Sequence, residues 1–343
     1  MDSIYEVRWA RLDEGDKLME FLRKYWNENH ILAKDKIMFD FQHRDIDKYN
    51  VVIGYNKESG DIDGFWGMIP VSLYDQDLRM NGDWWGAILK VNKDVRNSEI
   101  GWLALRMYKF ITQIEGARSW GFFALGPQGA AFEWRLNKYK GYVNQYYIAN
   151  KKVEDFKVGR NLQKRSFAKS QTIIKDIEIE SVDRLPYSTY KPQKSLKYLV
   201  NRYVRHPYFK YCFWGVYLGC ELKSIWVYRK LEVPEGGAVL RIMDMVGNIE
   251  GLDSVGDAVQ ELLQRESCEY LDVMNYGISP EAFEKLGFTR LDYNQKEIVV
   301  PDYFYPYECV NAPLNFAYNG YEDYCIFKAD GERDRPNTLE HVR

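Results

Sequence analysis

The sequence is poor in cysteine and histidine, and those present are not spaced as metal ligands. Its five cysteines, an odd number, include no Cys-x-x-Cys pair, and there are only four histidines in 343 residues. Zinc sites and disulfide scaffolds depend on clustered cysteines and histidines. We therefore expect buried, reduced thiols, no metal site and no disulfide framework.

Long apolar runs and a strong excess of one charge are also lacking. No run reaches the roughly 20 apolar residues of a membrane-spanning helix, and the start of the chain has neither the basic nor the apolar segment of a signal peptide. A net charge of −3 supplies no basic field for sequence-independent nucleic-acid binding. We expect a cytoplasmic protein with no membrane span and no nucleic-acid partner.

What the sequence does contain is a large supply of apolar and aromatic residues. Apolar residues make up 46% of the chain, and it has 10 Trp, 27 Tyr and 17 Phe. This composition is typical of a globular protein, and 343 residues are enough for two cores. Large rings serve core packing and, when exposed, stacking on sugars or bases.

Strand-like and helix-like runs follow one another in an order that occurs twice. In the first half we expect strands at residues 5–9, 51–55, 62–71, 84–91, 122–125 and 142–149, and helices at 14–26, 100–115 and 130–138. In the second half we expect helices at 195–205, 254–265 and 280–286, and strands at 212–218, 224–229, 239–246, 270–274, 296–300 and 324–328. The pattern predicts a mixed α/β fold with domains at 1–150 and 191–343.

Residues 151–190 separate these halves and are linker-like, although 173–179 has the composition of a strand. Their basic residues, and those of Lys191-Pro-Gln-Lys194 just beyond, are interpreted as a solvated surface, with phosphate binding as the alternative.

One junction between a strand and a helix suggests a ligand. The apolar strand Leu89-Lys-Val91 runs into a polar loop containing Arg96 and Gly101, and an amphipathic helix follows directly. Backbone N–H groups in such a loop and at a helix start are unsatisfied donors. The junction therefore suits a phosphate or pyrophosphate group.

The loop Arg96-Asn-Ser-Glu-Ile-Gly101 and two helix endings, Phe283–Phe288 and Asn137–Tyr142, resemble those of the GNAT superfamily of acyl-CoA-dependent N-acyltransferases. The family's loop reads R/Q-x-x-G-x-G/A, and Arg96-Asn-Ser-Glu-Ile-Gly101 matches it except that Glu99 replaces the first glycine. Its aromatic-x-Lys-x-Gly-Phe helix ending is matched by Phe283-Glu-Lys-Leu-Gly-Phe288 and, more loosely, by Asn137-Lys-Tyr-Lys-Gly-Tyr142.

Three further segments resemble the tandem-GNAT proteins that are encoded with surface-polysaccharide pathways. They are Arg205–Tyr211, Leu240–Gly247 and Phe327–Asn337. The last of these includes Asp330-Gly-Glu-Arg-Asp-Arg-Pro-Asn337, which has a second interpretation as a capping segment that closes the second domain.

The resemblance implies two tandem GNAT-like domains with coenzyme A bound to the first. The pantetheine arm would pair along Leu89 and Val91. The pyrophosphate would lie on the loop formed by Arg96, Asn97, Ser98, Glu99, Ile100, Gly101 and Trp102. The second half has no matching loop, so we expect a degenerate domain there that helps form the acceptor site.

The resemblance also implies the acceptor, an amino-deoxysugar carried on a nucleoside diphosphate such as dTDP or UDP. Two alternatives stay open. One is a Fem-like transferase acting on a peptidoglycan or lipid-linked acceptor, and the other is a non-catalytic binding protein with the same fold. Both a monomer and a homodimer are compatible with the sequence.

The family's usual general acid, a tyrosine, is replaced by Asn137 in the first half and by Phe283 in the second. The thiolate would then take the proton of the amine itself; Tyr139 is a substitute candidate or a packing residue. For a base or amine-orienting group we consider Asp83, which has an alternative role in the turn at Asn81-Gly82, and His43. Histidine accepts protons near neutral pH.

Further candidates for acceptor contacts are polar residues at or near strand ends and beside His43. They are Gln42, Asn92, Arg241, Asp244, Asn275 and Tyr276. Arg241 and Asp244 have a second interpretation, as a buried ion pair. His30 and His206 are interpreted as structural residues.

Overall fold

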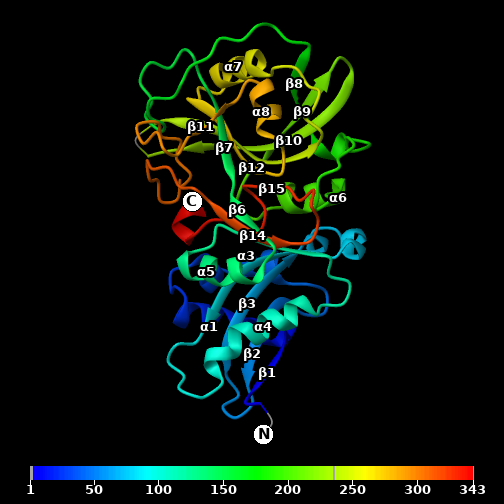
Figure 1. Ribbon diagram of the computed structural model, residues 1–343, viewed down its shortest axis with the longest axis vertical. Helices are drawn as coiled ribbons and strands as arrows, with labels where there is room; N and C mark the ends of the chain where they lie inside the picture. The colour runs from blue at the N-terminus through cyan, green and yellow to red at the C-terminus, as the bar shows by residue number, and fades with distance from the viewer. Residues whose placement is uncertain (1–2, 235, 343) are drawn as a thin grey trace.

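The computed structural model describes residues 3–234 and 236–342 and contains two mixed sheets, one above the other along the long axis (Figure 1). The expected class, a mixed α/β fold with two GNAT-like sheets, is confirmed. The strand order is β1-β2-β3-β4-β5-β14-β6 in the first sheet and β13-β7-β12-β11-β10-β9-β8 in the second, where β15 also pairs with β12.

The strands of the first sheet are β1 (Tyr5–Ala10), β2 (Tyr49–Asn56), β3 (Ile62–Pro70), β4 (Asp83–Val91), β5 (Ser119–Phe123), β6 (Tyr139–Tyr142) and β14 (Asn315–Asn319). Those of the second are β7 (Asn144–Ala149), β8 (Thr172–Asp176), β9 (Cys212–Leu218), β10 (Glu221–Glu232), β11 (Ala238–Gly247), β12 (Tyr270–Tyr276), β13 (Thr289–Arg290) and β15 (Ile326–Phe327). The α-helices are α1 (Gly15–Tyr25), α2 (Ile31–Lys34), α3 (Lys36–His43), α4 (Leu103–Thr112), α5 (Pro127–Leu136), α6 (Leu196–Leu199), α7 (Gly256–Arg265) and α8 (Pro280–Lys285).

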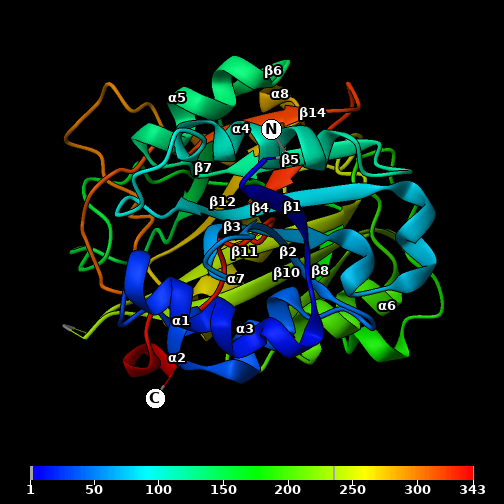
Figure 2. The same ribbon diagram turned by 90° about the horizontal axis from the view of Figure 1, so that it is seen from below.

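Helices cover both faces of the first sheet. Figure 2 shows α1, α2 and α3 on one side of it and α4 and α5 on the other. Helix α1 buries Leu18, Phe21 and Leu22, which recur at the spacing of one helix face and pack beside Phe65 of β3. Helix α4 buries Leu103 and other apolar residues on the opposite face of the sheet.

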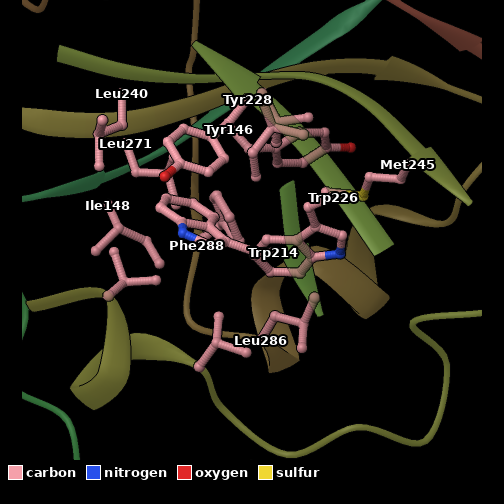
Figure 3. Packing of buried hydrophobic residues seen from close by; sticks show 14 of the residues in the cluster. Tyr146, Ile148, Trp214, Trp226, Tyr228, Leu240, Met245, Leu271, Leu286 and Phe288 are labelled. Atoms are coloured by element: carbon pink, nitrogen blue, oxygen red, sulfur yellow. The ribbon is translucent and has the colours of Figure 1, made fainter. Parts of the chain in front are cut away.

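The second sheet has a core of its own on the side of α7 and α8. Tyr146, Trp214, Trp226 and Phe288 all belong to this cluster (Figure 3). The ring of Tyr146 stacks on Phe283 of α8 with ring centroids 4.3 Å apart. Phe283 of the Phe283–Phe288 motif is therefore a core residue, which accounts for an aromatic side chain at this position.

The two sheets exchange a strand each, so no single cut of the chain separates them. β7 pairs with β12 of the second sheet, although it follows β6 of the first. β14 returns from the C-terminal half and lies between β5 and β6. The strand expected at Tyr142–Ala149 is in fact two strands, divided at Val143, that belong to different sheets.

Each sheet has one parallel pair of strands, and in both the pairing is short. β4 pairs with β5 from Asp83↔Ser119 to Gly86↔Phe122, and beyond Gly86 the two strands separate. β11 pairs with β12 over only three residues, from Leu240↔Leu271 to Ile242↔Val273. The two resulting openings, one per sheet, are called the first and the second splay below.

Several expected elements differ from those observed. The strand expected at residues 296–300 is only an isolated bridge from Val299 to Arg160, and β14 was not expected at all. Lys194, expected in a solvated linker, is buried with an ion-paired side chain. Within the described part of the chain, no helix has both the length and the apolar character needed to cross a membrane.

Candidate functional site

The first splay leaves one edge of β4 without a partner strand. Beyond Gly86, residues Leu89–Val91 pair with β3 on one side, and among the described residues no strand pairs with Ala87–Val91 on the other. The register with β3 shifts between Trp66 and Met68, which marks a bulge in β4 at the point where the strands separate. A Cβ at Gly86 would lie 2.1 Å from the ring of Phe122, so only glycine fits there.

The end of β5 is turned away from β4 and held by β14. Ala124 has a positive φ of 52°, and its N–H donates to the carbonyl of Asn315 at 2.7 Å. The Asn315 side chain satisfies both backbone groups of Leu125, at 2.7 Å and 3.1 Å. The exchanged strand β14 therefore keeps the first splay open.

The second splay is filled by the chain itself. β15 pairs with β12 at Asn275↔Phe327 and Tyr276↔Ile326, and the N–H of Ala329 donates to the carbonyl of Met243 on β11 at 3.0 Å. The Asn275 side chain donates to the carbonyl of Ile326 at 3.1 Å. We call residues 324–330 the plug, because they take both free strand edges of this splay.

The loop after β4 is anchored by side-chain hydrogen bonds. Asn92 donates to Asp63 at 2.9 Å, and Asn97 donates to the hydroxyl of Tyr5 at 2.8 Å. The side-chain Oδ1 atom of Asn97 accepts from the N–H groups of Glu99 and Ile100 at 3.0 Å and 2.8 Å. Two of the loop donors expected to face a pyrophosphate are thus already satisfied.

Glu99, which stands where the family motif has glycine, connects the loop to the start of the chain. Its carboxylate accepts from the N–H of Ile4 at 3.0 Å, contacts the Ser3 hydroxyl and pairs with Arg106 at 2.8 Å. The hydrogen bonds from Ser3 and Ile4, and then Arg106, lower the pKa of Glu99. A negative charge therefore sits beside the loop, largely neutralised by Arg106.

The expected cofactor residues lie together along one edge of the first sheet. Leu89 and Val91 are half-buried on the free part of β4, and Ser98, Gly101 and Trp102 are exposed where the chain enters α4. Arg96 is also exposed, and its guanidinium donates to the carbonyls of Lys93 and Val95 in its own loop. With Lys90 and Lys93 nearby, this edge has basic side chains available to an anionic ligand.

His43 does not reach an opening in the structure. Its ring is fully buried; it contacts Gln42 at 3.1 Å and the Met68 carbonyl at 3.4 Å. A Cβ at Gly67 would lie 2.7 Å from this ring, so His43 fills the space that the glycine leaves. Burial lowers the pKa of His43 to about 3. These contacts favour a packing role for His43 and for its buried neighbour Gln42.

Asp83 lies at the closed end of the β4–β5 pair, three residues before the strands separate. It is buried and accepts a hydrogen bond from Ser119, its partner in the parallel register, at 2.6 Å. Burial raises its pKa. At about 3.3 Å per residue, Asp83 is roughly 10 Å from the splay, which favours a role in joining β4 to β5.

The acceptor candidates of the second half are buried in polar networks. Arg241 donates to Asp272 at 2.7 Å and 2.9 Å, and it also pairs with Asp302. Asp244 accepts from Lys194 at 2.6 Å and from the Tyr203 hydroxyl at 2.5 Å. The interpretation of Arg241 and Asp244 as an ion pair is therefore wrong. Each of them forms buried ion pairs with other residues instead.

Tyr276 and Asn275 occupy the junction between the two sheets. The ring of Tyr276 packs on Phe316 of β14 with centroids 4.2 Å apart. Asn275 donates to the plug and accepts from the N–H of Ile278 at 3.1 Å.

Asn137 stands at the position of the family's tyrosine. Its side-chain amide donates a hydrogen bond to the carboxyl group of the buried Glu133 at 2.8 Å, and burial raises the pKa of Glu133 to about 8.

Residues after the plug line a cavity that the sequence did not predict. Gly331 lies against β4, where a Cβ would be 3.8 Å from the Cβ of Trp85 and 3.9 Å from the carbonyl oxygen of Gly86. The next residues, Glu332–Arg335, line a cavity of about 120 Å³ beside β10 and β11. The only signal in the sequence was the dense charge of Asp330–Asn337.

These two splayed parallel pairs, each continuing into a loop and a helix, define a tandem GNAT fold. Solved structures with this fold include a GCN5-related N-acetyltransferase from Anabaena variabilis, with a TM-score of 0.51 and 9% identity, over 91% of this chain and 72% of that one. A probable N-acyltransferase from Enterococcus faecalis V583 matches with a TM-score of 0.52 and 7% identity, over 92% and 72%. The sequence itself matches no protein-family model and no curated protein.

Proposed function

We propose that the protein is an acyl-CoA-dependent N-acyltransferase whose donor site is the first splay. The observation that carries this proposal is the contrast between the two splays. Residues Ala87–Val91 keep a free strand edge, whereas the corresponding edges of the second splay are taken by the plug. A single donor site in the N-terminal half follows.

The residues present fit the two ends of an acyl-CoA molecule differently. The free edge of Ala87–Val91 suits the amide groups of a pantetheine arm, which would add to the sheet like a further strand. At the loop, Asn97 already satisfies two N–H groups, so the side chains of Lys93 and Arg96 would hold the phosphates. When bound, coenzyme A supplies the acyl group as an activated thioester.

The chain's own contribution is position and electrostatics. The bulge after Gly86 orients backbone groups of β4 differently from those of a regular strand. An N–H group of this segment would stabilise charge developing on the thioester oxygen, an effect of about 2.7–4 kcal/mol per donor in comparable sites. Neither His43 nor Asp83 is needed for this role.

For the acceptor we propose the amine of an amino-deoxysugar carried on a nucleoside diphosphate. The proposal draws on the likeness of three segments to tandem proteins of polysaccharide pathways, and the cationic cavity beside Gly331 supports an anionic acceptor. Cytoplasmic location and a monomeric or homodimeric state remain part of this proposal.

Ligand-dependent thermal unfolding tests the donor class, because a ligand that binds only the folded state raises the melting temperature. We expect acetyl-CoA or a longer acyl-CoA to raise it at near-millimolar concentration. Thiol release in the presence of dTDP- or UDP-linked amino sugars then tests the acceptor. If no CoA ester shifts the melting temperature, the proposed function is wrong, and release only with peptidoglycan fragments would point to a Fem-like acceptor.

A further inference from the structure

The cavity of about 120 Å³ after the plug lies between the second sheet and the C-terminal segment. Figure 1 shows this segment, coloured red, between the two sheets. The cavity is lined by basic and acidic side chains on β10, β11 and the segment itself, together with aromatic residues of the loop at 303–305. Its size suits one small charged group rather than a whole nucleotide.

The basic side chains of this cavity outnumber the carboxylates that pair with them. Five basic residues line it, namely Arg229, Arg241, Lys328, Arg333 and Arg335. Four carboxylates pair with them. Arg229 pairs with Asp334, Arg335 with Glu332, Arg241 with Asp272, and both Arg241 and Lys328 with Asp302.

Arg333 forms no ion pair with a carboxylate among the described residues, although its charge helps to lower the pKa of the nearby Asp302. Arg333 also has no hydrogen bond in the described part of the chain, and its Nε atom is buried. Arg335 uses only Nη2, which donates to Glu332 at 2.9 Å. Its side chain is only 9% exposed, and its Nε and Nη1 atoms are buried with no partner in residues 3–234 and 236–342. Buried donors are normally hydrogen-bonded, so these N–H groups have the capacity to donate to an anionic ligand.

The pKa values of two neighbouring groups are lowered chiefly by burial, and the arginines of the cavity add to the effect. Burial, together with Arg333 and Arg241, lowers the pKa of Lys328 to about 8 even though Asp302 is in contact with it. Burial lowers the pKa of His30 to about 2, and Arg335 adds to this effect. The Oδ2 atom of Asp302, which also lines the cavity, is buried with no hydrogen-bond donor among the described residues. A ligand that has an oxyanion and an adjacent N–H or O–H group would pair with the arginines and with Asp302.

We propose that Arg333 and Arg335 bind an oxyanion, a phosphate or a carboxylate, of the acceptor substrate. Binding of the anion follows from the geometry of the cavity, whereas its assignment to the acceptor rests on the proposed function. Gly331 lies between the cavity and the proposed donor site. It directly precedes Glu332 of the cavity, and it lies against β4 at Gly86, where the first splay begins. An acceptor anchored here by its anion would be close to that splay.

Thermal unfolding of the full chain in sodium phosphate, sodium acetate and sodium chloride at equal ionic strength tests this site. We expect saturable stabilisation by phosphate or by acetate but not by chloride, and the anion that acts tells a phosphorylated acceptor from a carboxylated one. Arg333→Gln and Arg335→Gln should each weaken binding at least about tenfold, because hydrogen bonds from charged groups to an anion are strong.

A matched variant separates this cavity from other arginine sites. Arg184→Gln changes an exposed arginine elsewhere and should bind the anion as the wild type does. If Arg335→Gln does not fold, the test depends on Arg333→Gln, and Arg335→Lys serves as the second variant. No saturable binding, or equal binding by Arg333→Gln, would overturn the proposal. If anion binding is confirmed while no CoA ester binds, only the proposed function fails.

Discussion

The amide nitrogen of Ala329 donates a hydrogen bond to the carbonyl oxygen of Met243 over 3.0 Å, and this contact fixes the plug between the two diverging strands of the second sheet. Lys194 strengthens the same junction, because its ammonium group pairs with Asp244 on β11 at 2.6 Å and with Asp330 at the end of the plug at 3.0 Å. In the second half, the plug thus occupies the strand edges that correspond to the free edge of β4 in the first half.

We predict that the plug contributes substantially to stability. Ile326→Ala removes a fully buried side chain at the junction of the two sheets, and deletions of this kind cost about 2–5 kcal/mol. The free energy of unfolding in urea measures the loss. Ile173→Ala is the matched control, because Ile173 on β8 is 43% exposed and should cost less than about 1 kcal/mol. Equal losses in the two variants would contradict a packed plug.

A second prediction concerns the donor loop. Arg96→Glu should weaken binding of a CoA ester at least about tenfold, since a charged contact to phosphate is lost and a negative charge is added. Its folding should be unaffected, because Arg96 is exposed and donates only to carbonyls of its own loop. Calorimetric titration measures the affinity, with Arg184→Glu as the control of equal net charge. Unchanged affinity would place the cofactor elsewhere.

A third prediction concerns Glu99, which replaces the glycine of the family motif. Here we expect CoA esters to bind more tightly, not more weakly. Glu99→Gln keeps an acceptor for the N–H of Ile4 but removes a negative charge beside the loop. We expect CoA esters to bind up to about fivefold more tightly, because exposed charge interactions are worth about 0.2–1 kcal/mol, and the gain should shrink in high salt. Glu180→Gln, at an exposed position, should change nothing. Weaker binding of Glu99→Gln would mean that Glu99 itself contacts the ligand.

Local sequence patterns predicted most of the elements, including the strand and the helix on either side of the proposed donor loop. β9 was expected at 212–218 and is observed there, and the order strand, loop and helix around Arg96 is confirmed. These features depend on hydrophobic period and on turn residues, which are local properties. The association of Leu89, Val91 and the loop residues follows from the same short segment.

The exchanged strands and the plug depend on contacts between distant segments, and for this reason they were not predicted. β14 pairs with β5 almost 200 residues earlier in the chain, and nothing in Asn315–Asn319 indicates which sheet it joins. Lys194 was expected in solvent because its neighbours are polar, yet Asp244 and Asp330 compensate its burial. His43 and Asp83 were candidates by residue type, and only the structure shows how deeply they are enclosed.

The fourth prediction uses the buried histidines. Burial lowers the pKa of His43 to about 3 and that of His206 to about 2, whereas an unfolded histidine has a pKa near 6.5. Between these values the unfolded state binds more protons, so stability is lost as the pH falls below 6.5. Glu133, whose pKa is raised to about 8, has the opposite effect, because it contributes stability that is lost as the pH rises. The contribution of one histidine must therefore be obtained as the difference in stability between the wild type and a variant without that histidine.

Comparison of the wild type with His43→Gln isolates that contribution. Between pH 7.5 and 5.5 the wild type should lose about 1.4 kcal/mol more than the variant, since one protonatable group is removed and each pH unit below 6.5 costs about 1.4 kcal/mol. Urea unfolding at each pH measures the difference, and His206→Gln should show the same change of slope. Turnover at pH 7.5 should stay within about tenfold of the wild type, because the ring is fully buried and has no exposed atom to offer a substrate. A folded His43→Gln variant with turnover reduced 10²–10⁴-fold, the usual range for a lost general base, would instead assign His43 to catalysis.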